Sequence, residues 1–165
     1  MTGTLETRDD GRSALRFERR LNHSVERVWR AVTAPDELAR WFVAPVTWTP
    51  ELGERLDTMG EITELDPPSH IAWTWGTEEF SFRLASDGDD GCTLVFIHVI
   101  DDRALGAQHA SGWEAYFKRL DAHLAGGFLD ELEAHDDAAG IHEAYAEKFG
   151  LDPTPGREMI AKIRG

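Results

Sequence analysis

The stretch QHASGWEAYFKRLDAHL, residues 108–124, decides the fold predicted for this chain. Its large apolar side chains recur at helical spacing, while charged side chains occupy the opposite side. The apolar set is Trp113, Tyr116, Phe117, Leu120 and Leu124, and the charged set is Glu114, Lys118, Arg119 and Asp121. Gly126-Gly127 ends the pattern, as glycine commonly does after the last helical turn. We therefore predict one long amphipathic helix with a wide apolar face to cover.

The chain before this helix alternates in the manner of β-strands. Alternating or continuously apolar runs occupy residues 14–21, 71–75, 80–84 and 93–100, and residues 46–65 are strand-like but irregular. Hairpin-type sequences separate them: DPPS at 66–69, GT at 76–77 and DGDDG at 87–91. Short strands joined by such turns indicate an antiparallel meander. The long helix is the only element large enough to cover one face of it.

Two shorter helices are predicted between the first strand and the meander. Ser24 is a typical N-cap residue, and residues 25–33 carry an apolar stripe that Pro35 ends. A second short helix is expected over residues 36–42. Beyond the long helix, residues 138–149 and 157–163 read as further helices. We predict an α+β fold with three parts: a flexible leader (1–12), a main domain (13–126) in which a curved antiparallel sheet wraps around the long helix, and a helical C-terminal extension (127–165).

Charge and composition exclude several classes of protein. The chain carries 17 Lys+Arg against 31 Asp+Glu, a net charge of −14, which argues against binding to nucleic acid or to an anionic membrane surface. The single cysteine, Cys92, excludes an internal disulfide and fits a reducing compartment. The N-terminal residues lack the apolar core of a signal peptide, and no stretch approaches the length of a membrane span. We therefore expect a cytoplasmic protein with no membrane span.

Several short motifs carry a resemblance to a known family. They are ERVWRAVT (26–33) followed by LARWF (38–42), GEI (60–62) with LDPP (65–68) and WTW (73–75), TLVFIH (93–98), and HASGW (109–113). In this order, over about residues 14–126, they resemble the START-like helix-grip (SRPBCC) superfamily. More narrowly, they resemble the branch named after the C-terminal domain of the activator of the Hsp90 ATPase. The resemblance implies a helix-grip fold, but that superfamily hosts lipid carriers, hormone receptors, polyketide cyclases and chaperone cofactors.

The space between sheet and helix is where we expect a ligand site. A sheet of this kind has more inward apolar surface than one helix can fill, and apolar pockets with few polar groups hold small ligands. Each aromatic side chain taken alone is as readily an ordinary core residue. The candidate wall residues are Trp41, Trp73, Trp75, Phe80, Phe82, Phe96, Trp113 and Phe117.

Three polar residues are candidates within this space. His98 shares a strand face with Leu94 and Phe96, and is either a ligand-binding or proton-transfer group or a core histidine satisfied by a neighbour. His109 lies four residues before Trp113, so the two share a helix face, either at a cavity mouth or packed on the strands. Arg19 breaks the alternation of its strand, and is either a counter-charge for an acidic ligand or a salt-bridge partner at the sheet end.

Other chemistry-bearing residues are assigned simpler roles. Gly112 is expected to permit close approach of the long helix to the sheet. The carboxylate pairs Glu78-Glu79 and Asp101-Asp102 fall at predicted turns, where we expect them to be solvated. No spacing predicts a metal site, a phosphate-binding loop or a nucleophile, so no metal, cofactor or catalytic residue is expected.

Three functions remain open on the sequence. The leading hypothesis is a non-catalytic protein that binds a small hydrophobic molecule in the cavity. The second is a chaperone-cofactor or stress-response module, with the C-terminal helices contacting a protein partner or a second copy of this chain. The third is a cyclase- or hydrolase-type enzyme that uses His98 or His109 as acid–base.

Overall fold

A seven-stranded antiparallel sheet forms the body of the protein. The computed structural model describes residues 2–44, 46, 48, 53, 55–56, 60–88 and 90–164. The strands are β1 (Thr4–Thr7), β2 (Ser13–Leu21), β3 (Arg55–Leu56), β4 (Gly60–Asp66), β5 (His70–Trp75), β6 (Glu78–Ser86) and β7 (Cys92–Ile100), and their order across the sheet is β1-β2-β7-β6-β5-β4-β3. The meander predicted from the sequence accounts for β4 to β7. In the rest of the irregular segment 46–65, the structure describes residues 46, 48 and 53 and the short strand β3, and the other positions lie outside the described residues.

The register places aromatic side chains in rows across the sheet. Phe17 of β2 is opposite Phe96 of β7, which is opposite Phe82 of β6. In the next row on the same face, His98 of β7 lies between Leu15 of β2 and Phe80 of β6. Because side chains two residues apart share a face, these rows build one continuous aromatic surface.

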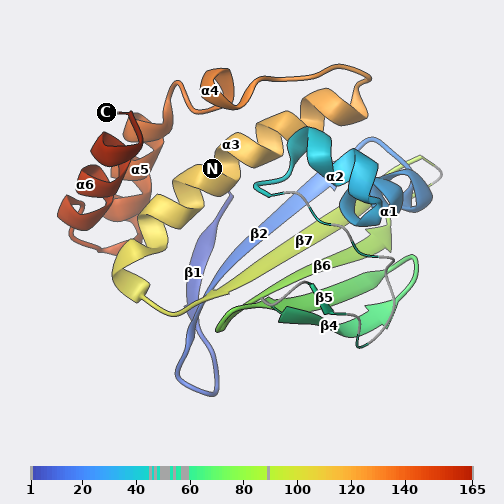
Figure 1. Cartoon of the computed structure of the whole chain (residues 1–165), viewed down its shortest axis with the longest axis horizontal. Helices are drawn as coiled ribbons and strands as arrows, with labels where there is room; N and C mark the ends of the chain where they lie inside the picture. Colours follow the sequence, from blue (N-terminus) through green and yellow to red (C-terminus); the bar gives the residue numbers. More distant parts are fainter. Residues whose placement is uncertain are drawn as a thin grey trace.

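The long helix α3 (Gly106–Leu124) covers this surface, and follows a short 3₁₀ turn, η1 (Arg103–Leu105). Figure 1 shows α3 crossing one face of the sheet, with α1 (Val25–Thr33) and α2 (Pro35–Trp41) at one end. Ser24 caps α1 as predicted, because its side chain accepts a hydrogen bond from the Arg27 amide. The α+β architecture predicted from the sequence is therefore confirmed.

The first residues do not form the flexible leader that the sequence analysis expected. Residues 4–7 form β1, which pairs with β2 from Thr4 opposite Arg16 to Thr7 opposite Ser13. The amide of Gly3 donates to the Tyr145 hydroxyl, and Lys148 Nζ donates to the Gly3 carbonyl over 2.7 Å. Partners more than 140 residues away in the sequence hold this segment, so its local polarity gave no signal of them.

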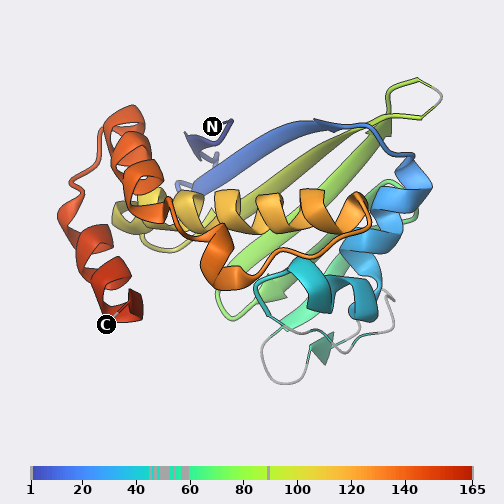
Figure 2. The same ribbon diagram turned by 90° about the horizontal axis from the view of Figure 1, so that it is seen from above.

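The C-terminal extension consists of α4 (Glu131–Ala134), α5 (Ala138–Phe149) and α6 (Thr154–Arg164). The sequence predicted α5 and most of α6, but not the single turn α4. Seen from above, the chain runs back along α3 through α4 before it reaches α5 and α6 (Figure 2). Hydrogen bonds tie it to α3: Ser111 donates to the Ala138 carbonyl over 2.8 Å, and Tyr145 donates to Glu114.

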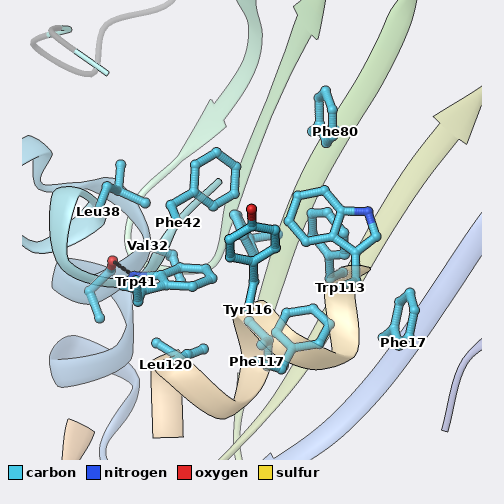
Figure 3. Packing of buried hydrophobic residues seen from close by; sticks show 14 of the residues in the cluster. Phe17, Val32, Leu38, Trp41, Phe42, Phe80, Trp113, Tyr116, Phe117 and Leu120 are labelled. Carbon is cyan, nitrogen blue, oxygen red and sulfur yellow. Dashed lines mark hydrogen bonds between the residues drawn. The ribbon is translucent and has the colours of Figure 1, made fainter. Parts of the chain in front are cut away.

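The core is filled mainly by aromatic rings. Figure 3 shows Trp113, Phe117 and Leu120 of α3 beside rings from the sheet and from α2. Phe96 is in ring contact with both helix aromatics, at 4.5 Å from Trp113 and 5.6 Å from Phe117. Such tilted and edge-on pairs stabilise a core beyond the burial of area alone. Phe96 and Phe117 are each at most 1% exposed, so the rings fill this part of the interior.

Candidate functional site

A cavity of about 430 Å³ opens between α3, the edge of the meander and the residues after α2. Strand residues, α3 residues and one residue of the extension contribute to its wall. The apolar lining is Val43, Ala44, Trp75, Phe80, Gly112, Trp113 and Tyr116, and the more polar lining is Glu78, His98, Gln108, His109 and His135. The space between sheet and helix is therefore partly open, and ligand-sized.

A chain of hydrogen bonds crosses one wall of this cavity. The indole Nε1–H of Trp113 donates to Nδ1 of His98 over 2.9 Å. Indole is a donor only, so Nδ1 must accept, and the neutral ring carries its proton on Nε2. That nitrogen lies 2.7 Å from Glu78 Oε1 and donates to it. The other carboxylate oxygen, Oε2, accepts the Asp101 amide over 3.0 Å. Both ring nitrogens of His98 are thus engaged inside the protein.

Burial holds His98 in its neutral form. The ring is 3% exposed and stacks on Phe80 with centroids 4.4 Å apart. Desolvation lowers the pKa of His98 to about 4, although the hydrogen bond to Glu78 acts in the opposite direction. The indole donor requires an unprotonated Nδ1, so the hydrogen-bond geometry agrees with this direction.

His109 is the second imidazole at the cavity, and its ring centroid lies 5.1 Å from that of His98. Burial lowers the pKa of His109, although the nearby carboxylates of Glu78 and Asp102 act to raise it. No hydrogen bond from a described residue engages this ring. A neutral imidazole can both donate and accept, so His109 can offer a hydrogen bond to a molecule in the cavity.

The structure divides the predicted site residues into three groups. Five of them line the cavity: Trp75, Phe80, His98, His109 and Trp113. Five others are at most 1% exposed in the solid core and do not line it: Trp41, Trp73, Phe82, Phe96 and Phe117. Arg19 also lies away from the cavity. Its guanidinium makes two hydrogen bonds to Asp121, of 3.0 and 2.6 Å, and lies over the Phe117 ring.

Sequence reasoning missed several lining residues. Glu78 was expected to be solvated at a turn, but it begins β6 directly opposite Trp75 and reaches inward to His98. Tyr116 lies on the same helical stripe as Trp113, and that stripe was the available signal for it. Val43, Ala44, Gln108 and His135 carry no sequence signal, because their place at the cavity depends on how α2 and the extension dock.

Gly112 does not have the role expected from the sequence. A Cβ atom built at this position meets no other heavy atom within 4 Å, so the helix does not approach the sheet closely there. Gly112 instead lines the cavity. The missing side chain leaves open space at the middle of α3.

Two further properties bear on the chemistry. In the part of the chain that the structure describes, no group of three or more His, Cys, Asp and Glu side chains is arranged to hold a metal ion. None of the helices described is both long and apolar enough to cross a bilayer.

Comparisons with known proteins identify the fold and the family. The family model described as activator of Hsp90 ATPase homolog 1-like protein matches residues 22–125. Among solved structures, CalU16 from Micromonospora echinospora is 22% identical with a TM-score of 0.68, over 88% of this chain and 94% of that chain. EF2215 from Enterococcus faecalis is 22% identical with a TM-score of 0.70, over 90% of both chains.

A further structure, the Aha1 dimer from Colwellia psychrerythraea, is 19% identical with a TM-score of 0.55, over 67% of this chain and 95% of that chain. At these identities the solved structures establish the fold alone. A search of curated proteins gave no match. The family model spans more than half of the chain and agrees with the observed fold. This chain therefore belongs to the activator of Hsp90 ATPase homolog 1-like family, within the SRPBCC superfamily.

Proposed function

We propose that this protein binds a small hydrophobic molecule, other than an anion, in the cavity between α3 and the meander. The observation that carries the proposal is the cavity itself. Its volume of about 430 Å³ lies within the usual range of ligand pockets, and aromatic rings from three elements line it. Among its polar groups, Glu78, His98 and His109 lie close together, where they can orient a ligand.

The charges of the lining favour neutral ligands over acidic ones. Glu78 is the ionisable carboxylate at the cavity, and the two imidazoles beside it have lowered pKa values. None of the described lining residues is Arg or Lys, and Arg19 is paired with Asp121 elsewhere. An anion would enter against Glu78 and against the net charge of −14.

The hydrogen bonds at the cavity limit which histidine could act as acid–base under the enzyme hypothesis. An acid–base role for His98 would require breaking its hydrogen bond to Trp113 or to Glu78, so a catalytic role falls to His109.

Assembly through the C-terminal helices would use surfaces of these helices other than those that contact α3. The subunit count in native mass spectrometry reports on that assembly directly.

The proposal is tested with a compact neutral probe, N-phenyl-1-naphthylamine, whose fluorescence rises in an apolar site. We expect saturable binding with a dissociation constant in the micromolar range. The variant Trp75→Leu removes a half-buried cavity wall and should weaken binding about tenfold, because it removes aromatic contact area. Trp29→Leu changes a half-buried tryptophan of α1 outside the cavity and is the matched control.

Native mass spectrometry of freshly purified protein provides the second measurement. A small molecule retained by the wild type and lost from Trp75→Leu supports the proposal. Absence of any retained molecule, together with probe binding weaker than about 1 mM, contradicts it.

A further inference from the structure

A second cavity, of about 700 Å³, lies beside the first, between α3 and the C-terminal extension. Its wall combines one side of α3 with the single turn α4 and parts of α5 and α6. The lining residues are Gln108, Ser111, Gly112, Tyr116, Glu131, Leu132, His135, Asp136, Ala138 and Ile160. The residues beyond 125 lie outside the family match, so the extension supplies a wall that the matched domain lacks.

The two cavities meet along one stripe of α3. Gln108, Gly112 and Tyr116 line both, and they follow one another at intervals of four residues, so they share a helix face. His135, after α4, also lines both. At the middle of the stripe Gly112 has no side chain, and a Cβ placed there would have no heavy atom within 4 Å. The helix surface between the cavities is therefore bare.

Gln108 offers an unused acceptor at this junction. Its Oε1 atom is buried and has no hydrogen-bond partner among the described residues. A buried acceptor without a partner costs free energy, and a donor brought in by a ligand would satisfy it. The residue lies in both linings, so a group that passes from one cavity to the other lies next to it.

The second cavity is acidic at its edge. Glu131 and Asp136 line it, and none of its described lining residues is Arg or Lys. Glu131 accepts a hydrogen bond from the Tyr116 hydroxyl over 2.7 Å. Burial and this carboxylate raise the pKa of Tyr116, so the phenol remains a donor at neutral pH. Glu131, on a protein of net charge −14, favours a cation at this edge, and acts against the nearby Arg119 guanidinium, which lowers the pKa of Tyr116.

We propose that the two cavities are chambers of one site for an elongated molecule, with a flat apolar ring system in the inner chamber and a protonated amine in the outer chamber. The inner chamber is the cavity of the proposed function, so this inference rests on that proposal. The outer chamber adds the selectivity. A longer chain is accommodated past Gly112, and the Glu131 carboxylate favours a positive over a negative terminal group.

A matched series of probes separates the two chambers. N-phenyl-1-naphthylamine has neither a tail nor a terminal charge, and Trp75→Leu tests whether it binds in the inner chamber. N-(1-naphthyl)ethylenediamine and N-(1-naphthyl)octane-1,8-diamine share one ring and one terminal amine and differ in tail length, while 8-(1-naphthylamino)octanoate reverses the terminal charge. We expect the octane diamine to bind at least about tenfold tighter than the ethylene diamine, because its methylenes are buried. The octanoate should bind at least about tenfold weaker than the octane diamine.

Two variants, each with a matched control, test which residues cause the effects of tail length and terminal charge on probe affinity. Gly112→Leu fills the junction and should reduce the advantage of the long tail to within about twofold. Gly140→Leu is the control, since Gly140 is an exposed glycine of α5 with equally open space. Glu131→Gln keeps an acceptor for Tyr116 but removes the charge, and should weaken the octane diamine about fivefold without affecting N-phenyl-1-naphthylamine. Glu133→Gln, an exposed carboxylate of α4 that does not line the chamber, is its control.

The outcomes separate this inference from the proposed function. If N-phenyl-1-naphthylamine binds but tail length and terminal charge have no effect, the two-chamber site is wrong and the inner site stands. If none of the probes binds, both are overturned. If Gly112→Leu does not fold, as judged by circular dichroism, Glu131→Gln decides the matter alone.

Discussion

Trp113 of α3 and His98 of β7 are joined by a hydrogen bond of 2.9 Å in which the indole donates to Nδ1. The bond links the long helix to the centre of the sheet, and through Nε2 it continues to Glu78 on β6. It fixes the tautomer of His98 and the orientation of the Trp113 ring that forms one wall of the inner chamber.

Replacing Trp113 with Phe keeps an aromatic ring but removes the donor. We expect the free energy of unfolding to fall by about 2 kcal/mol, because Nδ1 of the buried His98 is left without a partner. Urea denaturation measures the change. Trp29→Phe is the control, because Trp29 is a half-buried residue of α1. It should lower the free energy of unfolding by less. An equal loss in both variants would show that the hydrogen bond contributes nothing.

Stability should fall as the pH is lowered from about 6.5 to 4. His98 has a pKa of about 4 in the folded protein and about 6.5 when unfolded, so the unfolded chain binds more protons across this interval. The contribution is fully present above pH 6.5 and is lost toward pH 4, on the order of 3 kcal/mol. Urea titrations at a series of pH values measure it.

The variant His98→Gln isolates this effect. It should flatten the dependence of the free energy of unfolding on pH between 6.5 and 4.5. Part of the slope will remain in His98→Gln, because burial also lowers the pKa values of His70, His109 and His142. An unchanged slope in His98→Gln would contradict the assignment.

Gly112→Ala should stabilise the protein. The added methyl group meets open space, and alanine is favoured over glycine inside a helix by about 0.5–1 kcal/mol. Gly60→Ala should destabilise the protein by about 1–3 kcal/mol, because the added Cβ would lie 1.9 Å from the Thr74 carbonyl oxygen. Thermal unfolding of both variants provides the comparison. A loss of stability in Gly112→Ala would mean that the helix packs closely there after all.

Arg19 should prove to be a packing residue. A double-mutant cycle of Arg19→Met and Asp121→Asn is expected to give a coupling below about 1 kcal/mol, as is usual for ion pairs near a surface. Binding of N-phenyl-1-naphthylamine should change less than twofold in Arg19→Met. A tenfold loss of probe binding in Arg19→Met would contradict this prediction and would indicate that Arg19 contributes to the ligand site.

Tyr145→Phe should release the N-terminal edge of the sheet. The hydroxyl accepts the Gly3 amide and donates to Glu114, so its removal should cost about 1–2 kcal/mol. Hydrogen exchange of the β1 amides should accelerate more than that of β7. Tyr116→Phe, which loses only the bond to Glu131, is the control and should leave β1 protected.

Much of the fold was readable because its signals are local. The apolar stripe of residues 108–124 predicted α3, alternation predicted β2, β5 and β6, and a continuous apolar run predicted β7. Ser24 predicted the start of α1. Each of these depends on which side chains recur at a helical or strand period. These signals lie within the elements, so no tertiary contact was needed to find them, although some bounds differ: β6 extends over Glu78–Ser86, beyond the predicted 80–84.

The site divides along the same line. Aromatic residues on inward faces were the predicted candidates, yet periodicity cannot separate Phe80, at the cavity, from Phe82, buried in the core two residues later. Both lie on the same face of one strand. What differs is the group opposite each ring: Trp41 and Phe42 pack on Phe82, whereas Phe80 faces Trp113 of α3 beside the cavity.

The sequence by itself determined the α+β fold class, the order of most elements and the inward face of each. Only the tertiary structure decided that residues 4–7 join the sheet, that Glu78 meets His98, and that Gly112 faces open space. These facts depend on groups brought together from distant parts of the chain. A glycine in a helix allows close contact with a neighbouring element or leaves open space, depending on what lies opposite it. The residues next to it in the sequence do not determine which of the two occurs.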